Sequence, residues 1–361
     1  MGLKIKILNV VLTFFNFFVK MMKIKEHQVA FVSLESKVLE ADMKQIYDAL
    51  PDTYTKKCVL TKFDKNSLWN NFVYFLNTIK QLYVINTSKV VIINDNNFVI
   101  SSFKREGVNV IQVWHAAGAI KKFGNVIKRS YPIKNYDYVI CNGEYWKEAY
   151  SQAFSVRKEQ VVTTGMPRLD ELVDKTYLQV AKERLYQKYP QLQGKKIILY
   201  APTFRGDIYQ GMSKIDMDMI KIVENLPQDY ILLYKCHPLL NTASYGESDR
   251  IFNMNHEVLH DLFAISDCLV SDFSSIIFDF ALLDKPIYAY VPDLDEYLSD
   301  RGCFVDYEAM MDGVMAKSEE ALVDLLLEGK NEAKRMREDY VSCCDGHNLD
   351  RVVALIKDIM S

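Results

Sequence analysis

The residues from Ser271 to Ser275 form the segment of this chain best suited to bind an anion. An apolar stretch typical of a strand precedes them, and an apolar-periodic stretch typical of a helix follows until Lys285. Ser274 is placed to cap this helix, whose first backbone N–H groups lie at the positive end of the helix dipole. The segment therefore predicts a strand, a turn and a helix that bind a phosphate group.

Two aspartates accompany this turn. Asp272 lies just before the serines, and Asp279 falls about one helical turn after Ser275. That offset would aim Asp279 at ribose hydroxyls while the start of the helix holds a diphosphate. The structural alternative is a capping aspartate and a solvated helix face. The neighbours Phe278 and Phe280 favour the ligand interpretation, because they make the segment apolar enough to be buried.

Hydroxyl and cationic side chains follow two further predicted strands. The segment after Tyr200 carries Thr203, a hydroxyl donor, and Arg205, a planar cation suited to a diphosphate. An interdomain salt bridge is the alternative role for Arg205. His237 precedes Pro238, which favours an extended backbone and so sets the direction of the imidazole. That imidazole is suited to bind a nucleotide phosphate or to stabilise a departing diphosphate.

A histidine also follows a predicted strand in the first half of the chain. His115 precedes a loop with Lys121 and Lys122, an arrangement that suits a general base beside an anionic substrate. Two glycines in this loop would permit close approach of a ligand, Gly118 and Gly124. The alternative is a structural histidine that is hydrogen-bonded within a loop.

The segment Thr164-Gly-Met-Pro-Arg168 follows another strand and begins a helix. Gly165 allows the tight turn, and Pro167 suits the first helical position. Arg168 could then reach a phosphate. A simple turn with a solvated arginine is the alternative.

Short β-rich runs alternate with helical patterns from Gln28 onward, which predicts an α/β fold of parallel sheets with crossover helices. The predicted strands are Val29–Ser33, Lys57–Leu60, Lys89–Ile93, Val110–Val113, Tyr138–Cys141, Gln160–Thr163, Lys196–Tyr200, Tyr230–Tyr234, Cys268–Val270 and Pro286–Ala289. The predicted helices are Lys37–Ala49, Ser67–Leu82, Glu144–Phe154, Leu169–Tyr189, Lys214–Glu224, Glu257–Ile265, Ile276–Leu283, Glu319–Glu328, Asn331–Val341 and Leu349–Met360.

The length of 361 residues predicts two domains of roughly 150 residues each. Turn residues near Pro190–Gly194 mark the boundary, so we expect two doubly wound, Rossmann-like domains over 27–190 and 191–361 that face each other across a cleft. The last helix could pack back on the first domain. In such sheets ligands bind beyond the carboxyl ends of the strands, where the motifs above lie.

Composition excludes several classes of protein. Lys+Arg (44) and Asp+Glu (47) nearly balance, and basic and aromatic residues do not interleave, so we expect no nucleic-acid partner. Seven cysteines lack metal-ligand spacing, which favours a reduced, cytoplasmic chain. The histidines are dispersed, and His256 and His260 lack a third convincing donor, so we expect no metal site and no cofactor.

Residues 1–26 predict an amphipathic helix whose apolar run is too short and too interrupted for a membrane span. A narrow polar stripe runs along an otherwise apolar cylinder, formed by Lys6, Asn9, Thr13, Asn16, Lys20 and Lys23. Two interpretations are open. The helix lies on an anionic membrane with four aromatic side chains in the acyl boundary, Phe14, Phe15, Phe17 and Phe18, or it is buried against the protein or a partner subunit.

Six motifs stand in the order of one known set: Trp114-His-Ala-Ala-Gly-Ala-Ile-Lys-Lys, Thr164-Gly-Met-Pro-Arg, Ala201-Pro-Thr-Phe-Arg, Lys235-Cys-His-Pro, Ser271-Asp-Phe-Ser-Ser with Phe278-Asp, and Arg301-Gly-Cys-Phe-Val-Asp. Together they resemble the motifs of the CDP-glycerol glycerophosphotransferases of bacterial wall teichoic acid and capsule synthesis. The resemblance spans roughly Val29 to Tyr307, and an ordered set is far more specific than any one motif.

The resemblance implies a GT-B-type arrangement and a metal-independent transferase bound peripherally at the cytoplasmic face of the membrane. Its first domain would serve the acceptor, and its second would bind a CDP-activated polyol phosphate. His115 resembles the family's candidate base, and His237 is the second catalytic candidate. The family's diphosphate-binding positions are matched by Arg205, His237, Ser274 and Ser275, with Asp279 at the ribose.

The predicted reaction transfers glycerol phosphate from CDP-glycerol to a hydroxyl of a lipid-linked teichoic acid or capsule precursor, releasing CMP. CDP-ribitol is an alternative donor, because the chain departs from the family pattern at Ala116–Ala117 and at Met311–Gly313. A GT-B glycosyltransferase that uses a UDP-sugar and a non-catalytic nucleotide-binding scaffold are further alternatives. Homo-oligomerisation is also open.

Overall fold

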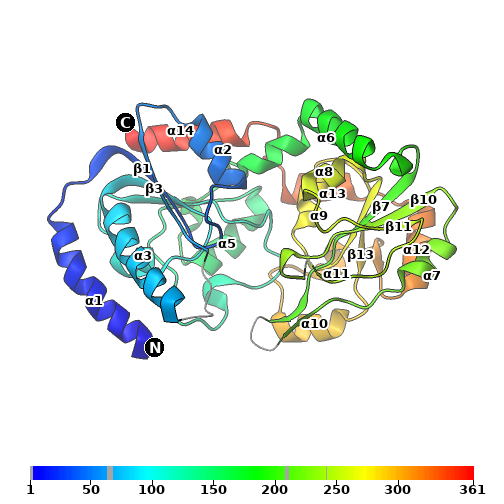
Figure 1. The fold of residues 1–361 in the computed structure, drawn as a ribbon, viewed down its shortest axis with the longest axis horizontal. Helices are drawn as coiled ribbons and strands as arrows, with labels where there is room; N and C mark the ends of the chain where they lie inside the picture. Colours follow the sequence, from blue (N-terminus) through cyan, green and yellow to red (C-terminus); the bar gives the residue numbers. More distant parts are fainter. Residues whose placement is uncertain (1–2, 63–67, 208–210, 241) are drawn as a thin grey trace. The chain divides into compact units, whose positions relative to one another are not determined.

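The computed structural model describes residues 3–62, 68–207, 211–240 and 242–361, which form two compact units (Figure 1). The first unit comprises the chain up to Ala116, Phe123–Asp170 and Cys343–Ser361, and the second comprises Ala117–Lys122 and Glu171–Ser342. The units thus divide at residue 170 rather than at the predicted 190. The reason is that α6 (Lys175–Lys188) packs on α8 (Leu259–Ile265) of the second unit.

The first unit contains a six-stranded parallel sheet with the order β2-β1-β3-β4-β5-β6. Its strands are β1 (Lys25–Ser33), β2 (Thr55–Leu60), β3 (Ser88–Ile93), β4 (Asn109–Gln112), β5 (Tyr138–Ile140) and β6 (Val161–Val162). Its helices are α1 (Leu3–Lys20), α2 (Ala41–Ala49), α3 (Leu68–Asn86), α4 (Phe98–Phe103), α5 (Lys147–Phe154) and α14 (Asn348–Met360). The central strands are continuous apolar runs because helices cover both faces of the sheet.

The second unit contains another six-stranded parallel sheet, with the order β11-β10-β7-β12-β13-β14. Its strands are β7 (Lys196–Tyr200), β10 (Tyr230–Tyr234), β11 (Ile251–Asn253), β12 (Cys268–Ser271), β13 (Ile287–Tyr290) and β14 (Met315–Ala316), and a separate hairpin pairs β8 (Arg205–Asp207) with β9 (Gly211–Ser213). Besides α6 and α8, its helices are α7 (Met219–Glu224), α9 (Ile276–Ala281), α10 (Leu294–Arg301), α11 (Tyr307–Met310), α12 (Glu319–Glu328) and α13 (Ala333–Tyr340).

Each predicted strand overlaps a strand of these two sheets, so the doubly wound α/β prediction is confirmed. The long predicted helix Leu169–Tyr189 starts late, because Pro167–Leu172 forms a 3-10 turn and the Asp174 carboxylate caps α6 by accepting the N–H of Thr176 at 2.8 Å. Sequence patterns missed several short elements, which are β8, β9, β11, β14, α4, α10 and α11. Ser67, the first residue of a predicted helix, lies outside the described residues.

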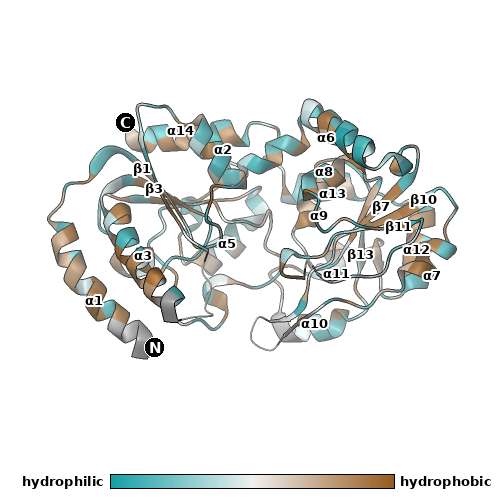
Figure 2. Cartoon of the chain, viewed as in Figure 1, coloured by the Kyte–Doolittle hydropathy of each residue, from teal (hydrophilic) through white to brown (hydrophobic). Residues whose placement is uncertain are grey.

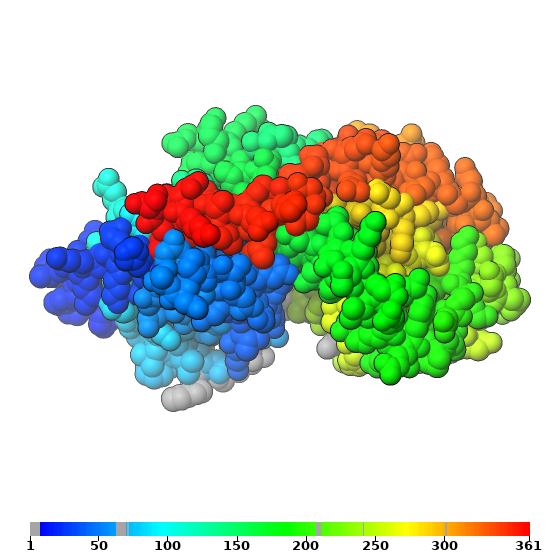
Figure 3. Space-filling view, turned by 90° about the horizontal axis from the view of Figure 1, so that it is seen from above, coloured from blue at the N-terminus to red at the C-terminus, as the bar shows by residue number. Residues whose placement is uncertain are grey.

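The last helix, α14, packs against α2 and β3 of the first unit, and the red C-terminal segment lies beside the blue α2 region in Figure 3. Its first residue, Asn348, is fully buried and donates from Nδ2 to the carbonyl of Met166 at 3.0 Å. The Asp170 carboxylate accepts the N–H groups of Asn348 and Leu349, at 3.0 and 2.9 Å. A remote segment therefore caps this helix.

The N-terminal helix α1 packs along α3 (Figures 1 and 2), and its side chains are described from Leu8 onward. Leu12, Asn16 and Val19 are buried, whereas the phenylalanines are exposed, with Phe14 at 62% and Phe17 at 66%. The predicted polar stripe therefore does not form one solvated face, because Asn16 lies on the packed side. No described helix is both long enough and apolar enough to cross a membrane.

A glycine next to the docked α14 provides a test of this packing. Gly165 has φ +76°, and a Cβ there would lie 2.1 Å from the Oδ1 atom of Asn348. We expect Gly165→Ala to lower the free energy of unfolding by about 2–3 kcal/mol in urea titrations, from backbone strain and from the clash. Gly194→Ala is the matched control, since Gly194 has φ +75° and no atom near its would-be Cβ, and only about 1 kcal/mol is expected. Equal losses of unfolding free energy in the two variants would show that the Asn348 side chain can move away without lowering stability.

Candidate active site

The second sheet changes its winding direction between β7 and β12, which are hydrogen-bonded neighbours. From β7 the chain adds β10 and β11 on one side, and then crosses to add β12 on the other. Ligands of doubly wound sheets bind at the carboxyl ends of the strands at such a switch point. Three of the predicted segments leave this edge, those that contain Thr203, His237 and Ser274.

Thr203 joins the loop after β7 to the turn after β12. Its N–H donates to Oδ1 of Asp272 at 2.9 Å, and its hydroxyl donates to Oδ2 at 2.8 Å. The hydroxyl of Tyr307 donates to the backbone carbonyl of Asp272 at 2.9 Å. The Asp272 side chain has no exposed surface, so in this structure it supports the turn from within rather than facing a ligand.

Arg205 lies between two carboxylates. It donates to Asp272 at 2.8 Å and forms a two-pronged contact with Asp293, at 2.5 and 3.0 Å. Its guanidinium also lies over the ring of Tyr297, 4.6 Å from the centroid. The hydrogen bond from Arg205 is the main reason that the pKa of Asp293 is lowered. The guanidinium of Arg205, predicted to bind a diphosphate, is therefore paired with carboxylates in this structure, and these pairs brace the turn.

The turn before α9 differs in detail from the prediction. Ser275, rather than Ser274, occupies the N-cap position, and it makes no side-chain capping hydrogen bond. The Oγ atom of Ser274 is 3.5 Å from the N–H of Ile276, a long contact for a cap. Both serine side chains are half-buried. An N-cap residue usually has an extended backbone, whereas Ser275 has helical backbone angles. Its hydroxyl is therefore not in the usual capping position.

Asp279, predicted to contact ribose, is buried on α9 and faces a histidine that the sequence did not connect to it. Its Oδ2 lies 3.7 Å from Nε2 of His260, whose Nδ1 is 3.3 Å from Oε2 of Glu171. Sequence spacing could not reveal this group, because its three members come from α9, α8 and the segment before α6.

His237 has its hydrogen-bonding state set by the turn that follows it. The N–H of Leu239 donates to Nδ1 of His237 at 3.2 Å, and the ring packs edge-on against Phe204 with centroids 4.9 Å apart. An Nδ1 that accepts a hydrogen bond carries no proton, so the neutral ring has its proton on Nε2. Nε2 is then a donor, as a phosphate-binding role requires.

His115 follows β4 in the first unit and has the opposite state. Its Nδ1 lies 3.1 Å from the backbone carbonyl oxygen of Asn94 and 3.3 Å from Oε1 of Glu35. A carbonyl oxygen can only accept, so Nδ1 carries the proton and Nε2 of the neutral ring has a lone pair. Trp114, which has φ +55°, lies against the imidazole with ring centroids 4.0 Å apart and the ring planes tilted by 30°. A strained backbone of this kind is common at functional sites.

The other predicted contact residues have structural partners. Arg168 donates to Oδ2 of Asp42 at 2.5 Å and to the carbonyl oxygen of His115 at 3.3 Å, so it braces the His115 loop rather than standing solvated. Lys121 forms an isolated β-bridge with Cys303, and its ammonium lies 5.4 Å from the ring centroid of Tyr297. Lys122 is exposed, although its N–H donates to the carbonyl of Gly302 at 3.1 Å.

The two loop glycines do not both serve as predicted. Gly118 is buried and is grouped with the second unit. Gly124 has φ +68°, and a Cβ there would lie 2.2 Å from the backbone oxygen of Ala153 on α5. The close approach that Gly124 permits is therefore to α5 and not to a ligand.

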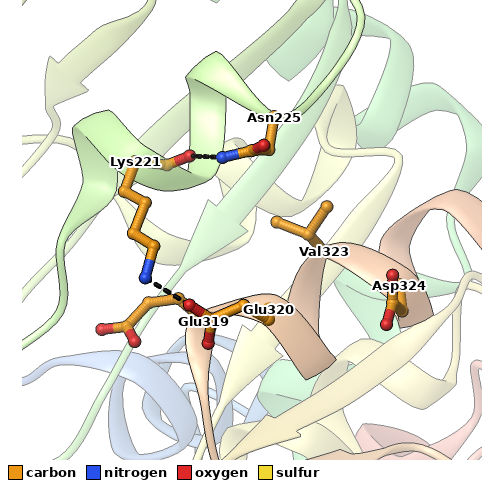
Figure 4. Close-up of a pocket in the computed structure, with 6 residues that line it drawn as sticks. All are labelled: Lys221, Asn225, Glu319, Glu320, Val323 and Asp324. Atoms are coloured by element: carbon orange, nitrogen blue, oxygen red, sulfur yellow. Dashed lines mark hydrogen bonds and ion pairs between the residues drawn. The ribbon is translucent and has the colours of Figure 1, made fainter.

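A surface pocket elsewhere in the second unit is unsuited to a diphosphate. Figure 4 shows this pocket, of about 280 Å³, between α7 and α12. Its lining residues are Lys221, Asn225, Glu319, Glu320, Val323 and Asp324. The ammonium of Lys221 is paired with Glu320, and the other two carboxylates would repel an anion. In the described part of the chain, no group of three or more His, Cys, Asp or Glu side chains could hold a metal ion.

A family model described as CDP-Glycerol:Poly(glycerophosphate) glycerophosphotransferase matches residues 13–358. The chain therefore belongs to this family of teichoic acid polyol-phosphate transferases, as the ordered motifs predicted. It is 29% identical to a teichoic acid ribitol-phosphate primase of Bacillus spizizenii, over 94% of this chain and 93% of that one. It is 30% identical to a teichoic acid glycerol-phosphate primase of Bacillus subtilis (strain 168), over 79% and 78%. It spans 42–57% of the length of the ribitol-phosphate polymerases that it matches.

Solved structures confirm the GT-B-like fold. The wall teichoic acid polymerase TagF superposes with a TM-score of 0.72 at 23% identity, covering 96% of this chain and 93% of that one. A putative UDP-N-acetylglucosamine 2-epimerase from Listeria monocytogenes superposes with a TM-score of 0.58 at 16% identity, covering 92% and 96%. Another TagF structure was obtained after a soak with CDPG.

The Arg205 ion pairs lead to a stability prediction. Asp272→Asn removes a fully buried charge that pairs with Arg205, and we expect the free energy of unfolding to fall by about 3 kcal/mol in denaturant titrations. Glu320→Gln is the control, because it breaks the exposed pair with Lys221 and should leave the titration midpoint nearly unchanged. A midpoint for Asp272→Asn that matches the wild type would contradict the supporting role of the buried pair.

Proposed function

We propose that this chain transfers glycerol phosphate from CDP-glycerol to a hydroxyl of a lipid-linked teichoic acid or capsule precursor and releases CMP. Membership of the family over residues 13–358 supports the class of reaction. The observation that carries the proposal is the pair of histidines at strand exits. Nε2 of His115 is available to accept a proton, and Nε2 of His237 carries one to donate.

The acceptor hydroxyl attacks the β-phosphorus of the donor in line. The bond from that phosphorus to the bridging oxygen breaks, and CMP leaves with the electron pair. His115 takes the hydroxyl proton on Nε2 as the new phosphate ester forms. His237 donates a hydrogen bond from Nε2 to the charge that develops on the diphosphate.

The remaining donor-binding assignments follow the motif after β12. Ser274 and Ser275 contact the diphosphate with their half-buried hydroxyls, and Asp279 contacts the ribose. Thr203, Asp272 and Arg205 hold this turn in place, and Arg205 adds its positive charge from within the ion-pair group. Arg168, Lys121, Lys122 and Gly118 belong to the acceptor or phosphate side.

Ribitol phosphate from CDP-ribitol is a second candidate. The observation that favours it is the ribitol-phosphate primase, which matches this chain across 93% of its own length, against 78% for the glycerol-phosphate primase at nearly the same identity. Both donors therefore belong in one assay.

The test of the function uses purified protein, a lipid-linked acceptor and equal CDP-glycerol and CDP-ribitol, in EDTA, with mass spectrometry of the product. We expect CMP release and addition of glycerol phosphate without an added metal. His115→Ala should lower kcat by at least about a hundredfold, because it removes the general base. A product that contains ribitol phosphate would favour the second candidate, and turnover only of UDP-sugars would favour the glycosyltransferase alternative. Bound CDP-glycerol without any turnover would favour the scaffold.

We also propose that α1 attaches the chain peripherally to the anionic cytoplasmic face of the membrane. A line of exposed apolar side chains, each about one turn after the last, supports this and is formed by Val10, Phe14, Phe17 and Met21. The neighbouring helix α3 exposes further apolar residues, Phe72, Val73 and Leu76. Exposed Lys20 and Lys23 follow the apolar line, where they could meet lipid phosphates.

Vesicle flotation tests this attachment. We expect the wild-type chain to float with vesicles that contain phosphatidylglycerol, and the Phe14→Ser/Phe17→Ser variant to lose most of this binding, because two large apolar side chains no longer enter the bilayer. Val180→Ser/Leu327→Ser is the control, since it removes comparably exposed apolar residues of the second unit. If the wild type fails to float, and light scattering shows a dimer that the phenylalanine variant dissociates, the covered surface is a subunit interface.

A further inference from the structure

A carboxylate absent from the predicted site lies next to His115. The sheet of the first unit changes winding direction between β1 and β3, and Glu35 comes two residues after the end of β1. Asn94 directly follows β3, and His115 follows the next strand, β4. The three residues therefore leave the same edge of one sheet, at its switch point.

The backbone of Glu35 is held in place, and its carboxylate lies beside Asn94. The Glu35 N–H donates to Oγ of Ser33 at 3.1 Å, and Oε2 makes a long contact of 3.5 Å with Nδ2 of Asn94. The preceding residue, Leu34, donates its N–H to Oδ2 of Asp95. The remaining oxygen of Glu35, Oε1, lies 3.3 Å from Nδ1 of His115. This loop is therefore pinned to the end of β3 with one carboxylate oxygen directed at the imidazole.

The two neighbours of Nδ1 do different chemical work. The carbonyl of Asn94 fixes the proton on Nδ1 in the neutral ring, but it carries no charge with which to stabilise a positive one. When Nε2 accepts a proton the ring becomes a cation, and an adjacent carboxylate offsets that charge. Glu35 is the side chain placed to do so.

Other ionisable groups of this unit have partners of their own. Arg168 donates to the backbone carbonyl of His115, and it forms a buried pair with Asp42. Burial raises the pKa of Asp95 to about 8, and its Oδ2 accepts the N–H of Leu34. Burial also raises the pKa of Glu35, and the proximity of His115 works in the opposite direction. Among these carboxyl groups, Glu35 is the one whose oxygen, Oε1, lies 3.3 Å from Nδ1 of His115.

We propose that Glu35 is a positioning residue that holds the His115 imidazole and stabilises its charged form during phosphoryl transfer. The proposal rests on the function proposed above, in which His115 is the base. No covalent step is assigned to Glu35, and the proton stays on His115 until CMP and product leave. The carboxylate acts through the histidine and does not contact the substrate.

The experiment measures kcat and KM for CDP-glycerol in wild type, Glu35→Gln, His115→Ala and the double variant. We expect Glu35→Gln to lower kcat by about ten- to a hundredfold, less than the loss of the base itself, with KM unchanged within about twofold. In the His115→Ala background the same change should cost nothing further, because Glu35 acts only through the imidazole. Glu35→Asp should recover part of the rate.

Two controls separate the possible failures. Asp350→Asn removes a carboxylate beside a surface histidine, His347, at a similar distance of 3.1 Å, and should leave kcat unchanged. Glu35 is partly exposed, and its amide variant is expected to melt with the wild type, so loss of rate without loss of melting temperature excludes misfolding. A normal kcat in Glu35→Gln, with His115→Ala inactive, overturns this inference alone. Near-normal turnover in His115→Ala overturns the proposed base and this inference with it.

Discussion

All strands of a parallel sheet end at the same edge, and the candidate residues of each unit depend on that constraint. Where the winding direction reverses, two neighbouring exits leave room for a ligand between their loops. Each unit has such a point, between β1 and β3 in the first and between β7 and β12 in the second. The loops at these points carry buried carboxyl groups, among them Asp95 in the first unit and Asp272 in the second.

Backbone groups set different tautomers of the neutral imidazole at two candidate residues, His115 and His237. A carbonyl fixes the proton of His115 on Nδ1, whereas an N–H fixes the lone pair of His237 on Nδ1. Backbone groups are suited to this because their donor or acceptor character cannot change with pH. Trp114, with φ +55°, directly precedes His115, and Pro238 directly follows His237 and restricts the backbone of that histidine.

Two arginines among the candidate residues are held in ion pairs with carboxylates from distant segments of the chain. Local sequence motifs therefore revealed their positions but not their partners. Arg205 braces the turn after β12 through Asp272 and Asp293, and Arg168, which pairs with Asp42, donates to the backbone of His115. A buried pair adds little net stability, yet losing one partner leaves the other charge uncompensated. Such pairs therefore favour one arrangement of the loops over others, which a preorganised site requires.

Local patterns in the sequence determined the α/β alternation, the strand ends and the ordered motifs, because period, turn residues and strand-exit chemistry are properties of adjacent residues. They therefore singled out His115, His237 and the serine turn as candidate site residues. Tertiary structure alone decided what these residues touch. Glu35 meets His115 from another strand, His260 meets Asp279 from another helix, and Gly165 is required by Asn348 far along the chain. The periodicity of α1 likewise did not show which face of the helix would be buried. In the structure, α1 packs on α3 with Asn16 buried and its phenylalanines exposed.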